Sequence, residues 1–168
     1  MVFSKRQYRN LLKNSEELKA AGKSLSSICE SDFNQLLRYS AKTWAQLEWE
    51  SRDFYAEIME NFLNGKISEV ELKAEFLKIQ ESHEQVQEAL ESNLIILSPN
   101  PNSDYIADLI DKLYWVLEDL SVDSTLSLDE LESLIKENKY EEVEKKKLRK
   151  NYNDVKKIYL KMQKFLEE

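Results

Sequence analysis

The sequence predicts an all-α fold: an antiparallel helical bundle with a long helical hairpin and extra helices at its N- and C-terminal ends. Turn residues are scarce, since only two glycines and two prolines occur in 168 residues, and a small sheet-rich domain needs many more. Apolar residues recur at three- and four-residue steps, the spacing that lines one face of a helix. With 42% hydrophobic and 33% charged residues, the chain can form both a core and a solvated surface.

The first helix is expected over residues 5–23, followed by a serine-rich linker that contains Gly22. The second is expected to be long, over residues 31–64, and to end at Asn64 and Gly65, which tolerate a left-handed C-cap. Its apolar stripe consists of Phe33, Leu36, Leu37, Trp44, Leu47, Phe54, Tyr55, Ile58 and Phe62.

The third helix is predicted to begin at Ser68, because Ser68 and Glu71 have the spacing of a capping box. It is expected to continue until Pro99 and Pro101, which cannot extend a helix. The short turn between the second and third helices predicts a helical hairpin.

The fourth helix is expected over residues 103–120, and a fifth from Ser127, where a second capping box occurs. After a kink near Asn138, a C-terminal helix is expected whose apolar residues are spaced alternately by four and three. That spacing is typical of a seam along another helix.

The charge is unevenly distributed. Residues 1–30 carry a net charge of +3, residues 31–137 carry −15, and residues 138–168 carry +4, for a total of −8. We therefore divide the chain into an N-terminal helical arm (1–30), an acidic helical bundle domain (31–137) and a basic C-terminal helix (138–168). The acidic domain repels nucleic acid and attracts basic protein surfaces, although acidic residues also simply keep helices soluble.

The inventory of reactive side chains argues against catalysis. Cys29 is the one cysteine and His83 the one histidine, so neither a disulfide nor a zinc site of paired ligands is expected. His83 falls on the apolar stripe of the third helix, where a structural role is expected. We expect no enzymatic activity, no cofactor, no metal and no small-molecule substrate.

The expected cellular location is inferred from two kinds of targeting segment. No secretory signal and no membrane-spanning run are recognised. The expected location is therefore the cytoplasm, or the plastid stroma if the gene is organellar.

One candidate partner surface lies on the fourth helix. Asp104, Asp108, Asp111 and Glu118 fall within about 40° of one line, and Trp115 lies in the middle of this stripe. Tryptophan is a favoured interface anchor, so the stripe predicts a basic protein partner. The alternative is that another helix, such as the basic C-terminal one, covers Trp115 within the molecule.

Trp49 is a second candidate anchor. It is placed about 160° from the centre of its helix's apolar stripe, so the same two interpretations, partner contact or internal cover, apply to it. The lysines at 145–147 and 156–157 are interpreted as a solvated helix face rather than a phosphate site.

Several segments resemble the colicin D immunity protein family. The run 62–68, followed by Glu71, Leu72 and Phe76, is similar to that family's opening helical hairpin. Residues 109–123, with Trp115, and the acidic run 128–132 are similar to its later helices, so the resemblance covers about residues 51–137. It implies a small acidic bundle that binds a toxin nuclease and imitates the negative charge of the nuclease's substrate.

Two functions therefore remain. The first is an immunity-like inhibitor that binds a basic protein. The second is a structural or linker subunit of a larger protein assembly, which extra basic segments around an acidic body favour.

Overall fold

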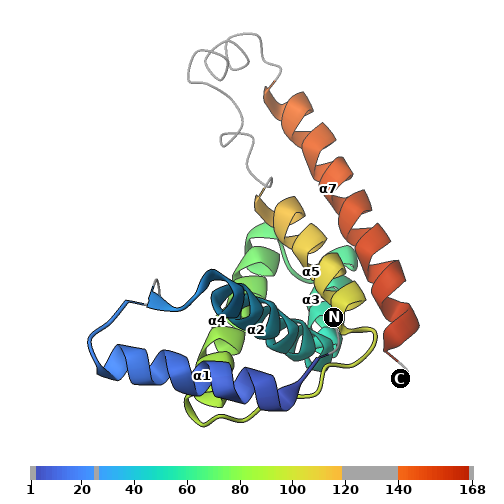
Figure 1. Cartoon of the computed structure of the whole chain (residues 1–168). Helices are drawn as coiled ribbons and strands as arrows, with labels where there is room; N and C mark the ends of the chain where they lie inside the picture. Colours follow the sequence, from blue (N-terminus) through green and yellow to red (C-terminus); the bar gives the residue numbers. More distant parts are fainter. Residues whose placement is uncertain (1–2, 25–26, 119–139, 167–168) are drawn as a thin grey trace. The chain divides into compact units, whose positions relative to one another are not determined.

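The computed structural model describes residues 3–24, 27–118 and 140–166, and every regular element in these ranges is helical. The order is α1 (Lys5–Ala20), α2 (Glu30–Glu50), α3 (Arg52–Leu63), α4 (Glu69–Ser92), α5 (Ser103–Glu118), α7 (Tyr140–Met162) and the short 3-10 helix η3 (Gln163–Phe165) (Figure 1). The predicted all-α class is therefore confirmed. The predicted helix start at Ser127 and the kink near Asn138 lie outside the described residues.

The helices group into two compact units. The first contains Met1–Ser51 and Lys78–Ala107, and the second contains Arg52–Leu77 and Asp108–Glu168. This grouping differs from the expected division into arm, acidic bundle and basic helix. The N-terminal helix is part of the first unit, where it packs on α2, and the C-terminal helix is part of the second, where it packs on α3.

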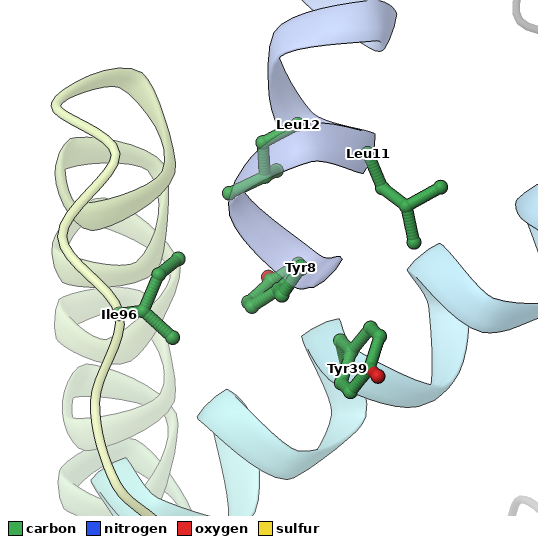
Figure 2. Packing of buried hydrophobic residues seen from close by; sticks show 5 residues of the cluster. All are labelled: Tyr8, Leu11, Leu12, Tyr39 and Ile96. Carbon is green, nitrogen blue, oxygen red and sulfur yellow. The ribbon is translucent and has the colours of Figure 1, made fainter. Parts of the chain in front are cut away.

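An apolar cluster holds α1 in the first unit. Its buried members come from α1, α2 and the segment after α4 (Figure 2): Tyr8, Leu11, Leu12, Tyr39 and Ile96. The rings of Tyr8 and Tyr39 stack with centroids 5.2 Å apart, and the ring of Phe3 meets Tyr39 edge-on at 5.3 Å. Because burying one large apolar side chain contributes about 1.5–3 kcal/mol, this cluster fixes α1 to the unit.

The carboxylate of Glu91 links three helices of the same unit. Its Oε1 atom accepts hydrogen bonds from the Tyr8 hydroxyl at 2.8 Å, the Ser40 hydroxyl at 2.6 Å and the Gln87 side-chain amide at 2.9 Å. These donors belong to α1, α2 and α4. Hydrogen bonds to a charged acceptor are stronger than neutral ones. This contact therefore orients α1, α2 and α4 relative to one another, which apolar packing alone does only weakly.

The expectation of one continuous helix over residues 31–64 is wrong, because the chain breaks at Ser51. Ser51 caps α2 with φ −97° and ψ 7°, outside the helical region. Its hydroxyl lies 2.8 Å from Nε2 of the buried His83. Serine side chains compete with helical hydrogen bonding, which accounts for a break at this residue.

The α4 helix ends at Ser92, before the prolines that were expected to end it. Leu94 has a positive φ of 53°, and the Ile95 N–H donates to the Leu90 carbonyl at 2.8 Å, as in a left-handed helix stop. Leucine adopts this conformation at a cost of about 1–2 kcal/mol. The burial of Ile96, two residues later, offsets that cost.

The turn between α3 and α4 follows the predicted signals. Gly65 has φ 68°, and the Lys66 N–H donates to the Asn61 carbonyl at 2.8 Å, which completes a glycine C-cap. The Glu71 N–H donates to the Ser68 hydroxyl at 3.3 Å, and the Ser68 N–H donates to the Glu71 carboxylate at 2.7 Å. The Ser68 N–H and the Ser68 hydroxyl both donate to the Glu71 carboxylate, and these two hydrogen bonds hold the pKa of the Glu71 carboxyl below its usual value. The predicted capping box is confirmed.

The core of the second unit comes from α3, α7 and the parts of α4 and α5 that belong to it. Its buried apolar side chains include Tyr55, Met59, Leu72, Phe76, Leu109, Ile110, Leu113, Leu117, Val155, Ile158 and Met162. The rings of Tyr55 and Phe76 lie 5.6 Å apart, as an antiparallel α3–α4 hairpin requires. The α3 helix packs on α7, and Arg52 Nε donates a hydrogen bond of 2.7 Å to the Phe165 carbonyl of η3.

Replacing Glu91 by alanine should lower the free energy of unfolding by about 2 kcal/mol, because the hydroxyls of Tyr8 and Ser40 lose a charged acceptor. The measurement is urea unfolding followed by circular dichroism. Glu88→Ala, at an exposed position on the same helix, is the control and should change stability by less than about 0.5 kcal/mol. Equal effects of the two substitutions would refute the proposed role of the Glu91 carboxylate.

Stability should also fall at high pH through Tyr8. Burial raises the pKa of the Tyr8 hydroxyl from 10.0 to about 12. Between these values the unfolded chain ionises while the folded chain stays neutral, so the tyrosine stabilises the unfolded state increasingly as pH rises. The free energy of unfolding of the natural protein should therefore decline more steeply above pH 10 than that of Tyr8→Phe. Parallel declines would contradict this.

Candidate functional site

The candidate site is a surface of the second unit, named here the α5 surface, made of Asp108, Asp111, Trp115 and Glu118. All four side chains are exposed, and Trp115 retains 69% of its accessible surface. The basic C-terminal helix packs on α3, so the alternative in which it covers Trp115 is not what the structure shows.

A chain of aromatic contacts positions Trp115. Its ring meets that of Tyr114 edge-on with centroids 5.4 Å apart, and the Tyr114 ring lies 6.3 Å from that of the buried Phe76. Edge-on aromatic pairs contribute about 0.5–1.5 kcal/mol beyond area burial. These ring contacts therefore connect the exposed indole with the core in the unbound protein.

Two of the carboxylates beside Trp115 make surface ion pairs with described residues. Asp108 pairs with Lys112 on the same helix, and Glu118 pairs with Lys73 of α4 at 2.9 Å. Exposed pairs of this kind contribute about 0–1 kcal/mol, so an incoming cation can replace them at little cost. Asp111 is exposed one helical turn before Trp115.

Asp104 does not join this group. It belongs to the first unit, where its carboxylate pairs with Lys42 of α2. The α5 surface is therefore shorter than the acidic stripe predicted from the sequence.

Trp49 is not a surface residue. Its side chain is 6% exposed, so internal cover is the interpretation that holds, and its expected role as a partner anchor is withdrawn. The helical pattern was misleading because it assumes one buried face, whereas every residue from 45 to 49 is buried. A helix segment surrounded on all sides has no solvent face to predict.

An apolar groove beside the α5 surface was not foreseen. This α4–α5 groove has a volume of about 420 Å³ and is lined by Glu69, Val70, Lys73, Ala74, Leu77, Leu117 and Glu118. Val70 at its edge is 78% exposed. The signal was the spacing of Val70, Ala74 and Leu77, which gathers them on one side of α4, at least about 100° around the helix from the core residue Phe76. Glu118 belongs to both the groove and the α5 surface.

His83 has a structural environment. It is 4% exposed, and its ring meets that of Trp44 edge-on at 5.7 Å. Burial lowers the pKa of the His83 imidazole, and the charge of Glu50 opposes this only partly. The expected structural role on the α4 stripe agrees with this environment.

No group of three or more His, Cys, Asp and Glu side chains among the described residues is arranged to hold a metal ion. Nor is any helix in the described part of the chain both long and apolar enough to cross a membrane.

The chain was compared with family models, curated proteins and solved structures, and none of the three comparisons gave a match.

The two tryptophans should respond oppositely to truncation. Trp115→Ala should lower the free energy of unfolding by no more than about 1.5 kcal/mol, because the side chain is mostly in water and loses mainly its edge-on contact with Tyr114. Trp49→Ala should cost about 3–5 kcal/mol, because it leaves a cavity at a buried position. Urea unfolding of both variants measures the difference, and a loss of several kcal/mol for Trp115→Ala would refute its assignment as an exposed anchor.

Proposed function

We propose that the protein is a non-catalytic binding module whose α5 surface and α4–α5 groove receive a protein partner with a basic surface. The observation that carries this proposal is Trp115, which is 69% exposed among three carboxylates. Large aromatic side chains are costly to leave in water, and tryptophan is enriched among residues that dominate interface energies.

The charges and the groove have different roles in recognition of the partner. Asp108, Asp111 and Glu118 accelerate encounter with a cationic surface and set its orientation. The α4–α5 groove takes an aliphatic side chain of the partner, with Val70 and Leu77 as its apolar walls. Binding of this kind weakens as salt rises, because exposed charges are screened over about 8–10 Å at physiological ionic strength.

The resemblance to the colicin D immunity family supports a specific form of this proposal, in which the partner is a toxin nuclease. A nuclease that binds a polyanion carries a basic site, and an acidic surface can occupy that site in place of the nucleic acid. In this form of the proposal, Trp115 anchors the contact and the carboxylates stand in for phosphates.

A second candidate function is a linker subunit of a larger protein assembly. The observation that favours it is the exposed row of cations on α7, which an inhibitor does not need. These residues are Lys145, Lys146, Arg149, Lys156, Lys157 and Lys161. In this function the protein joins one neighbour through the α5 surface and another through α7.

Reversing two carboxylates tests the proposed surface. Asp108→Lys/Asp111→Lys should weaken binding of the partner at least tenfold at low salt, because two attractive charges become repulsive. The tagged protein is used to capture partners from its source lysate, mass spectrometry identifies them, and titration measures affinity. The matched control is Glu57→Lys/Glu60→Lys, which makes the same charge change at exposed positions of α3 in the same unit.

A basic protein that is released by salt, retained by the control and lost from the α5 variant would support the proposal. A single nuclease would favour the inhibitor, and several subunits of one complex would favour the linker. Equal capture by both variants would show that the α5 surface is not the site.

A further inference from the structure

The exposed side of α7 carries an apolar residue that has cations one turn away. Leu160 is 51% exposed, although the apolar seam of α7 is buried on another side of the helix. Lys156 and Lys157 precede it by one turn of α7, and Lys164 follows four residues later in η3; all three side chains are exposed. Asp154, which pairs with Lys157 at 2.9 Å, is the one carboxylate among the described side chains of α7.

This arrangement has the opposite charge to that of the α5 surface. There, Trp115 is the exposed apolar residue, with Asp111 one turn before it and Glu118 one turn after it. Residues three and four positions apart on a helix are neighbours, so Leu160 has cations one turn away on both sides, whereas Trp115 has a carboxylate one turn away on each side and Lys112, the ion-pair partner of Asp108, beside Asp111. Both faces belong to the second unit.

We propose that the α5 surface of one copy of the chain docks against the Leu160 face of α7 in a second copy. Leu160 enters the α4–α5 groove beside Trp115, and the flanking lysines meet Asp111 and Glu118. A lysine ammonium can also lie over the indole of Trp115, an arrangement favoured by the ring's quadrupole. The proposal rests on the proposed function, because it keeps the α5 surface as a receptor for a basic partner and names that partner.

The contact is between copies rather than within one. Trp115 keeps 69% and Leu160 keeps 51% of its accessible surface, so neither residue is covered within its own chain. Because the two docking faces are different, the contact is heterologous, and a dimer still offers one free α5 surface and one free α7 face, on different copies. Association therefore continues beyond a dimer, into open chains or a closed ring.

Two single-face variants and their mixture test this geometry. Trp115→Ala/Asp111→Lys disables the α5 surface, and Lys156→Glu/Lys164→Glu disables the α7 face. Sedimentation velocity of the full chain over about a hundredfold range of concentration, at low salt and at about 0.3 M NaCl, measures association. The control for the first variant is Phe54→Ala/Glu57→Lys, which removes an exposed aromatic and reverses an exposed acid on α3.

The natural protein and the control should form species larger than dimers at low salt and dissociate at high salt. Each single-face variant should associate at least tenfold more weakly when alone. The equimolar mixture of the two variants should form a one-to-one heterodimer that does not grow, because only one complementary pair of faces remains in it. Circular dichroism verifies that each variant is as helical as the natural protein.

The proposal is overturned if the natural protein stays monomeric at every concentration, or if the variant mixture forms no heterodimer while the natural protein associates. A monomeric natural protein that still captures a foreign basic protein through Asp108 and Asp111 would leave the proposed function standing. A natural protein that neither self-associates nor captures a basic protein through Asp108 and Asp111 would refute the proposed function as well.

Discussion

A row of four aromatic rings connects the core of the second unit with its surface. Tyr55 and Phe76 lie 5.6 Å apart, Phe76 and Tyr114 lie 6.3 Å apart, and Tyr114 and Trp115 lie 5.4 Å apart. The first two side chains are fully buried, Tyr114 is 39% exposed and Trp115 is 69% exposed. Packing that fixes α3, α4 and α5 therefore also fixes the orientation of the exposed indole, which lowers the entropy lost when a partner binds.

In the first unit, apolar burial and one hydrogen-bonded carboxylate together determine how α1 packs. Apolar burial of Tyr8, Tyr39 and their neighbours supplies most of the free energy, but burial alone does not select one register of α1. The Glu91 carboxylate on α4 favours one register, since its Oε1 atom accepts hydrogen bonds from α1 and α2 as well as from Gln87 on its own helix.

Local signals in the sequence were sufficient for much of the fold. The Ser68–Glu71 capping box and the glycine stop at Gly65 act through atoms within a few residues, so their outcome could be predicted. The break at Ser51 and the stop at Leu94 could not, because they depend on His83 and on the burial of Ile96, which are remote in sequence. Trp49 was misplaced for the same reason, since periodicity does not indicate whether a second layer covers a helix.

The candidate site was only partly predictable. The spacing of Asp108, Asp111, Trp115 and Glu118 on one face follows from helical geometry, and the structure leaves that face exposed. Asp104 was assigned to it by the same geometry, but its pairing with Lys42 depends on the first unit. The α4–α5 groove required knowledge of which face of α4 is buried, which the sequence does not carry for a helix that is apolar on two sides.

The measurement that tests the central claim most directly is fluorine NMR of the protein labelled with 5-fluorotryptophan, which gives one resonance for each of the three tryptophans. Single Trp→Phe variants assign the resonances. In dilute protein the Trp115 resonance should shift when H₂O is replaced by D₂O, whereas that of the buried Trp49 should not. On addition of the captured partner, or at high protein concentration in low salt, the Trp115 resonance should lose its solvent shift. A Trp115 signal that is shielded in dilute protein, or that stays solvent-exposed in the bound state, would contradict the account.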